Sequence, residues 1–168
     1  GREIPRRRVY VADRFRASDE PRKVPNRPAD GIAGFRADLN LVRDAFDRFG
    51  LLDGRVRFLQ GEPGETLRDD RIEQIALLRL GPDLGDDAAA ALRATYDRMS
   101  PGGQVVVHAP DGSDTLSAVE AFRSERGISE ALVRVDAQVR AWLVPNDAAP
   151  QRKLPEPRSA QARLPTRV

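Results

Sequence analysis

Apolar and polar positions are segregated most clearly between residues 75 and 112. An apolar run over 75–80 ends at a Gly-Pro pair, a helical pattern follows over about 86–99, and a second apolar run occupies 105–107. Neither run shows the alternation of a half-exposed strand, so both are typical of parallel strands that are covered on two faces. The pattern therefore predicts a strand–helix–strand unit at the centre of the fold.

The ends of these two strands are where the pattern places a functional site. In open parallel sheets, ligands bind beyond the carboxyl ends of the strands. The first strand ends before Gly81, and the second ends near His108. Residues 81–83 and 108–111 are therefore the expected site loops.

The rest of the chain adds shorter elements around this unit. Further strands are predicted at 9–12, 56–59, 131–135 and 139–144, and further helical segments at 32–49, 67–74 and 116–127. This order predicts an α/β sandwich with a mostly parallel sheet and crossover helices. The last two strands are expected to form an antiparallel hairpin, because the link between them is short.

Two sets of apolar side chains are assigned to the core. Steps of four, three, four and three residues along the first helix give one apolar stripe, made of Phe35, Leu39, Val42, Phe46 and Phe49. This spacing is typical of an amphipathic helix with one buried face. Trp142 lies in an apolar closing strand and is expected to be buried as well.

Composition divides the chain into three parts. Residues 1–8 are a basic lead-in without periodicity, residues 9–144 hold the predicted elements, and residues 145–168 are rich in Pro, Ala and Arg. Because the last part has almost no large apolar residue, it is predicted to be a disordered tail.

Composition also excludes several classes of protein. The chain has 168 residues, 40% of them hydrophobic, a formal net charge of +2, no cysteine and a single histidine. These counts exclude disulfides, thiol chemistry and cysteine-based zinc sites, and they predict a cytoplasmic protein. No run approaches the roughly 20 apolar residues that span a bilayer, and the sparse aromatic residues do not alternate with a basic patch. Neither a membrane nor a nucleic acid is expected as a partner.

Several segments are similar to the macrocin-type O-methyltransferases, the TylF-like family, which act on sugar hydroxyls of antibiotics. The similar segments are 9–15, 46–67, 77–80, 99–107 and 118–128, and the block FGLLDGRVRFL is the most specific of them. The resemblance covers residues 9–144. It implies a Rossmann-like class I methyltransferase fold with strand order 3-2-1-4-5-7-6, and S-adenosylmethionine (SAM) as the cofactor.

The first strand of that family and the glycine-rich turn after it have no counterpart in this sequence. Only eight residues precede Val9. The resemblance implies that the missing strand lies in the middle of the sheet, between the strands that begin at Val9 and at Ile75. The gap can be closed by direct pairing of those strands, by another chain in a homo- or hetero-oligomer, or by an upstream domain. Unrepaired, it exposes strand edges.

The metal ligands of the family are also absent. Three family carboxylates hold Mg²⁺, which prefers oxygen ligands, and their positions here are Gly81, His108 and Ala109. No bound metal is therefore expected. Asp83 matches a second family acid and Asp111 lies nearby, so both are candidate residues of the substrate or site loop.

Three residues are candidates for the cofactor. Asp13 matches the acid that binds the SAM ribose, although it also fits a loop acid at a strand end. Gly61 and Glu62 belong to the loop beside the adenine, but the sequence Gly-Glu-Pro-Gly offers no obvious stacking surface. His108 is the candidate catalytic base in place of the metal, and the alternative is a residue without a role in a degenerate pocket.

Two hypotheses follow for the function. In one, the chain is a SAM-dependent O-methyltransferase-like domain for a sugar or small-molecule hydroxyl in natural product biosynthesis, with impaired catalysis. In the other, it is a pseudoenzyme, a non-catalytic structural or protein-interaction domain that completes its sheet with a partner.

Overall fold

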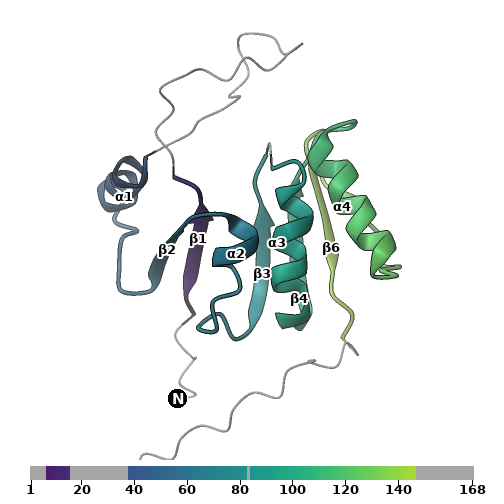
Figure 1. Cartoon of the computed structure of the whole chain (residues 1–168), viewed down its shortest axis with the longest axis horizontal. Helices are drawn as coiled ribbons and strands as arrows, with labels where there is room; N and C mark the ends of the chain where they lie inside the picture. Colours follow the sequence, from purple (N-terminus) through teal and green to yellow (C-terminus); the bar gives the residue numbers. More distant parts are fainter. Residues whose placement is uncertain (1–6, 16–37, 83, 147–168) are drawn as a thin grey trace, which may run out of the picture.

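The computed structural model describes residues 7–15, 38–82 and 84–146 (Figure 1). Within these ranges the strands are β1 (Val9–Asp13), β2 (Val56–Gln60), β3 (Ile75–Leu80), β4 (Met99–His108), β5 (Val133–Arg134) and β6 (Val139–Leu143). The helices are α1 (Leu39–Arg48), α2 (Pro63–Thr66), α3 (Asp87–Thr95), the 3-10 helix η1 (Tyr96–Arg98) and α4 (Asp114–Glu125). The predicted alternation of strands and helices is thus confirmed for the described residues.

The strands form two sheets rather than one. β1 and β2 pair in parallel, and a second sheet has the order β3-β4-β6-β5. In that sheet β3 and β4 are parallel, whereas β6 is antiparallel to both β4 and β5. The mostly parallel arrangement and the closing hairpin are therefore as predicted. Direct pairing of β1 with β3, one of the three expected ways to close the gap, does not occur in the described part of the chain.

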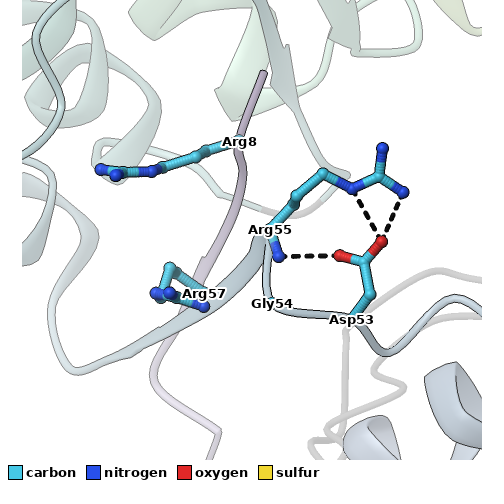
Figure 2. Close-up of a pocket in the computed structure, with 5 residues that line it drawn as sticks. All are labelled: Arg8, Asp53, Gly54, Arg55 and Arg57. Carbon is cyan, nitrogen blue, oxygen red and sulfur yellow. Dashed lines mark hydrogen bonds and ion pairs between the residues drawn. The ribbon is translucent and has the colours of Figure 1, made fainter. Parts of the chain in front are cut away.

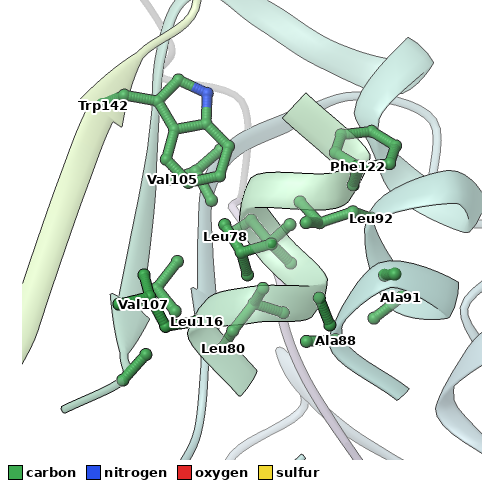
Figure 3. Close-up of a cluster of buried hydrophobic side chains, with 14 of the residues drawn as sticks. Leu78, Leu80, Ala88, Ala91, Leu92, Val105, Val107, Leu116, Phe122 and Trp142 are labelled. Carbon is green, nitrogen blue, oxygen red and sulfur yellow. The ribbon is translucent and has the colours of Figure 1, made fainter. Parts of the chain in front are cut away.

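The main core lies between the second sheet and helices α3 and α4 (Figure 3). The strands contribute side chains such as Leu78, Val105 and Trp142, and the helices contribute Leu92 and Phe122. Trp142 is only 2% exposed, which confirms its assignment to the core. Alternate residues of β3 point to opposite faces, so this sheet buries Leu78 and Leu80 under the helices while Leu77 remains exposed on the other side.

Helix α4 shows why the central helices form where the pattern predicts them. Ser113 precedes the helix, and its hydroxyl accepts a hydrogen bond from the backbone N–H of Leu116 at 3.2 Å. Such a cap satisfies one of the N–H groups that lack a partner in the first turn. The helix ends before Gly127, whose φ of +62° is the left-handed conformation that glycine adopts without strain.

Helix α1 departs from the sequence prediction. None of its residues is buried, and Phe49, which follows it, is 76% exposed. Phe46 makes the one aromatic contact of the stripe within the described residues, an edge-on packing against Phe58 of β2 at 5.4 Å between ring centroids. The assignment of Phe49 to the core is therefore wrong, because nothing in the described structure covers that end of the helix. Phe35 lies outside the described residues.

Two elements also differ from the prediction. The helix predicted over 67–74 is wrong, because the chain there forms turns and irregular backbone; the short helix α2 lies earlier, at Pro63–Thr66, where a proline suits the first turn. Strand β4 begins at Met99, so it also includes the Ser-Pro-Gly-Gly stretch that precedes the apolar run predicted over 105–107. Gly103 makes this pairing feasible, since a Cβ there would lie 2.8 Å from the carbonyl oxygen of Ser100 and 3.3 Å from that of Ala76.

Candidate functional site

Asp13 ends β1 at the carboxyl edge of the smaller sheet. Its backbone carbonyl accepts a hydrogen bond from Gly61 N–H at 3.0 Å, which joins the ends of β1 and β2. Its side-chain Oδ1 accepts a second bond from Phe15 N–H at 2.8 Å. Phe15 is buried and has a φ of +46°, a conformation that is uncommon for a residue with a Cβ. The carboxylate thus fixes a tight turn after β1 through its Oδ1. Its other oxygen, Oδ2, accepts no hydrogen bond from the described residues.

Arg14 joins two acidic side chains beside Asp13. Its Nε lies 2.8 and 2.7 Å from the two carboxylate oxygens of Glu62, and its Nη1 lies 2.8 Å from Oδ2 of Asp87. The carboxylate of Glu62, and to a smaller extent that of Asp87, raise the pKa of Arg14 above its ordinary value. Glu62, predicted to bind the cofactor, is therefore held by Arg14, a residue that no motif in the sequence marks as part of the site. The only feature of the sequence that could have indicated this role of Arg14 is its position directly after Asp13, the acid that ends β1.

Gly61 and Gly64 serve the packing of the loop after β2. Gly61 has a φ of +140°, and a Cβ there would lie 3.0 Å from Cγ2 of Thr66. A Cβ on Gly64 would lie 2.9 Å from the Cβ of Ala90, because α2 approaches α3 closely at this point. The cofactor-binding role of Gly61 stays a prediction.

His108 ends β4 opposite Val139 of β6. Its Nε2 lies 2.8 Å from Oε1 of Gln138. Because an amide oxygen can only accept, Nε2 carries the proton and Nδ1 is the basic nitrogen. Nearby, the backbone N–H groups of Gln138 and Val139 donate to Asp136 and hold its pKa below its usual value. A base at Nδ1 is thus chemically feasible, and the catalytic role of His108 stays a prediction.

Asp111 is bound by two arginines. Arg140 of β6 donates to its Oδ1, and Nη1 of Arg134 lies 3.2 Å from its Oδ2. Arg140 also donates to the carbonyl oxygen of Ala109, so this buried guanidinium fixes the loop after β4. Both carboxylate oxygens of Asp111 therefore have protein partners. Asp83, the other candidate of the site loops, lies outside the described residues.

The candidate residues form two groups rather than one. Arg14 connects Glu62 with Asp87 and directly follows Asp13 in the chain, whereas His108 and Asp111 are held by the β5–β6 hairpin. In the described ranges, no three His, Cys, Asp or Glu side chains are close enough to hold a metal ion. SAM fits the first group at one point, because Oδ2 of Asp13 can accept a ribose hydroxyl. The loop over 61–64 adds no aromatic side chain for the adenine.

A cleft of about 480 Å³ lies at the opposite, amino-terminal edge of the smaller sheet (Figure 2). It is lined by Arg8, Asp53, Gly54, Arg55 and Arg57. The Asp53 carboxylate accepts hydrogen bonds from the backbone and the side chain of Arg55, and these bonds lower the pKa of Asp53. The cleft contains none of the candidate site residues, and the carboxyl edge remains the candidate functional site.

Residues 2–143 match the family described as Macrocin-O-methyltransferase (TylF). The chain belongs to this family. It is 33% identical over 144 residues to the 8-demethyl-8-(2,3-dimethoxy-alpha-L-rhamnosyl)-tetracenomycin-C 4'-O-methyltransferase of Streptomyces olivaceus, covering 81% of this chain and 54% of the relative. It is 31% identical over 144 residues to the mycinamicin III 3''-O-methyltransferase of Micromonospora griseorubida, covering 81% of this chain and 57% of that one.

Solved structures support the same assignment. The O-methyltransferase NovP superposes with a TM-score of 0.68 and 29% identity, over 83% of this chain and 60% of NovP. A calicheamicin methyltransferase, at 20% identity, has the same fold with a TM-score of 0.58 over 84% of this chain and 62% of that chain. The Rossmann-like methyltransferase fold is thus confirmed. This TylF-family chain spans only a little more than half the length of the curated relatives it matches.

The comparisons and the structure do not test the predicted location, metal content, partners or division of the chain. No described helix has the length and apolar character needed to cross a membrane. The cytoplasmic location stays a prediction, as do the absence of a bound metal and the division into 1–8, 9–144 and 145–168.

Proposed function

We propose that this TylF-family chain binds SAM through Asp13 and belongs to an O-methyl transfer system whose metal-assisted step its own residues do not supply. The observation that carries the proposal is the carboxyl end of β1, where Asp13 is exposed and its Oδ2 has no hydrogen-bond donor among the described residues. A carboxylate oxygen at that position can accept from a ribose diol, and hydrogen bonds to a charged group are worth about 1.5–3 kcal/mol.

The acceptor class rests on the relatives. Two of them are named for methylation of a hydroxyl on a natural product, at a 4' and at a 3'' position. We extend this class, a sugar or small-molecule hydroxyl, to the present chain. His108 is the residue that would remove the hydroxyl proton, since its Nδ1 is basic when Nε2 bonds Gln138.

Impaired catalysis is the second part of the proposal. The positions Gly81 and Ala109 carry no carboxylate, and both oxygens of Asp111 are bound by arginines. A hydroxyl at neutral pH is a poor nucleophile unless a base or a metal ion removes its proton. We therefore expect SAM to bind with slow or no methyl transfer.

Isothermal titration with SAM and S-adenosylhomocysteine, with and without Mg²⁺, tests the binding. We expect a dissociation constant below about 1 mM that does not depend on Mg²⁺, and a loss of about tenfold or more in Asp13→Ala, equivalent to about 1.4 kcal/mol. Asp44→Ala, which removes an exposed carboxylate from α1, is the matched control. Absence of heat from the unmodified chain at millimolar SAM would contradict the proposal, and equal binding by Asp13→Ala would exclude the role of that residue.

Methyl transfer is measured separately with radiolabelled SAM and the two natural-product classes named for the relatives. Transfer at rates typical of enzymes, about 1 s⁻¹ or faster, would refute the impairment. A slow transfer that His108→Ala abolishes would support the base.

A further inference from the structure

The cleft at the amino-terminal edge of the smaller sheet is unusual in its lining (Figure 2). Its volume is about 480 Å³, and its described lining consists of three arginines, one aspartate and one glycine. Pockets of this size are usually lined mainly by apolar and aromatic side chains. Because the described lining contains no such side chain, the cleft suits a small ligand that is charged rather than apolar.

The pairing of β1 with β2 brings the arginines of the cleft together. Arg8 directly precedes β1 and Arg55 directly precedes β2, and the N–H of Val9 donates to the carbonyl oxygen of Arg55 at 3.0 Å. Side chains alternate between the two faces along a strand, so Arg55 and Arg57 lie on the same face. The next residue, Phe58, packs against α1. Arg55 and Arg57 therefore lie on the face of the smaller sheet opposite α1.

The single acid of the cleft is neutralised by one of the three arginines. The backbone N–H of Arg55 donates to Oδ1 of Asp53 at 2.7 Å, and its side-chain Nε donates to Oδ2 at 2.7 Å. Both carboxylate oxygens of Asp53 are thus bound by the same residue. Figure 2 shows no bond from Asp53 to Arg8 or Arg57. The acid therefore leaves the charges of those two arginines uncompensated.

Arg8 and Arg57 have no acidic partner in the described part of the chain. Both side chains are exposed. Nη1 of Arg57 donates to the carbonyl oxygen of Val56 at 2.9 Å, and its other N–H groups make no bond to the described residues. A guanidinium binds an anion through two parallel N–H groups. The cleft therefore offers two guanidinium groups to an anionic ligand.

We propose that this cleft binds the diphosphate group of a small molecule, with Arg8 and Arg57 as the binding residues. The planar guanidinium matches two oxygens of a phosphate group, and a diphosphate offers one negatively charged phosphate to each arginine. A nucleic acid is a poorer occupant, because the described lining has no aromatic side chain on which a base could stack. The site lies at the edge opposite Asp13, so the inference does not rest on SAM binding.

Isothermal titration of the 168-residue protein with inorganic pyrophosphate, and separately with uridine diphosphate, tests the binding. At low salt we expect a dissociation constant below about 1 mM, and a loss of about tenfold in about 0.5 M NaCl, because salt screens exposed charges. Tighter binding of uridine diphosphate would assign the site to a diphosphate ester, and equal binding would assign it to the diphosphate group alone. Absence of heat from both ligands at millimolar concentration would overturn the proposal.

Charge-matched variants locate the binding. The double variant Arg8→Gln/Arg57→Gln should weaken pyrophosphate binding by about tenfold or more, equivalent to about 1.4 kcal/mol. Arg48→Gln/Arg79→Gln removes two exposed arginines from α1 and β3, changes the net charge equally and should leave the affinity unchanged. All four side chains are exposed, so neither variant should alter the unfolding midpoint. Equal losses of affinity in the two variants would overturn the proposal, because they would show attraction to the net charge alone.

Removal of the acid tests the sign of the effect. Asp53→Asn keeps a side-chain oxygen for the backbone N–H of Arg55 but removes the negative charge, so pyrophosphate should bind about threefold more tightly or better. Asp44→Asn, which removes an exposed charge from α1, is the control and should leave the affinity unchanged. Weaker or unchanged binding by Asp53→Asn would overturn the proposal. Titration of the Arg8→Gln/Arg57→Gln variant with SAM separates the two sites, since its SAM affinity should equal that of the unmodified chain.

Discussion

Arg140 and Asp111 form a charge pair in which only one partner is buried. The Arg140 side chain is 8% exposed and the Asp111 side chain is 64% exposed. Arg140 also donates to the carbonyl oxygen of Ala109, a residue that is fully buried. Because a charge in water needs no partner whereas a buried charge does, we expect the two halves of the pair to respond differently to removal.

The expected costs follow from what each variant leaves behind. Arg140→Met leaves the exposed Asp111 carboxylate to water and Arg134, but the buried Ala109 carbonyl loses its donor, which costs about 1–3 kcal/mol. Asp111→Ala leaves a buried guanidinium without its anion. Removing one partner of a fully buried pair costs about 3–5 kcal/mol, and because the Asp111 side chain is 64% exposed we expect Asp111→Ala to cost less, about 1–3 kcal/mol. The double variant should cost no more than Arg140→Met alone, because it leaves no unpaired charge.

Urea unfolding followed by circular dichroism measures these free energies. Arg134→Met is the matched control, since it removes an exposed arginine from the same carboxylate and exposed pairs contribute only about 0–1 kcal/mol. The reasoning is refuted if the costs of the two single variants simply add in the double variant, or if Arg134→Met is as destabilising as Arg140→Met. Unequal m-values would show that a variant changes the unfolded state instead.

Two further predictions concern a glycine and a surface acid. Gly103→Ala should lower the free energy of unfolding by about 1–3 kcal/mol, because its Cβ would lie 2.8 Å from the backbone oxygen of Ser100. Gly54→Ala is the control: its Cβ would have open space around it, so this variant should be neutral or more stable by up to about 1 kcal/mol. Equal thermal unfolding midpoints of the two variants would exclude the clash. The side chain of Arg71 lowers the pKa of Asp69 to about 2. The unmodified protein should therefore have a higher free energy of unfolding than Asp69→Asn above about pH 4, and this difference should disappear as the pH falls towards 2. Carboxyl titration by NMR with a midpoint near 4 would contradict this.

Strands and helices were predictable where burial leaves a pattern in the sequence. The run over 75–80 and the helix that ends at Gly127 both pack in the main core, and both were placed within a few residues. Phe49 shows the limit of this reasoning. Helical spacing reveals which face is apolar, but it does not reveal whether another element covers that face. The exposed end of α1 therefore had no separate signal in the sequence.

The charged contacts at the site were not predictable in the same way. Arg140 and Asp111 are 29 residues apart, and neither helical nor strand periodicity links them. Arg14 likewise meets Asp87 only because β1 and β3 run alongside each other. Asp13 and His108 could be placed, since each directly ends a strand and the end of a strand is a property of the local sequence.

The lack of buried residues in β1, α1 and β2 has a consequence for how long the chain persists in a cell. No side chain within these three elements is fully buried, so this unit should open at a lower free energy than the rest of the domain. SAM bound at Asp13 of β1, as proposed above, would hold this unit closed, by about 2.7 kcal/mol at a SAM concentration 100 times its dissociation constant. Proteases act on opened states, and the abundance of this chain would therefore follow the concentration of SAM in the cell.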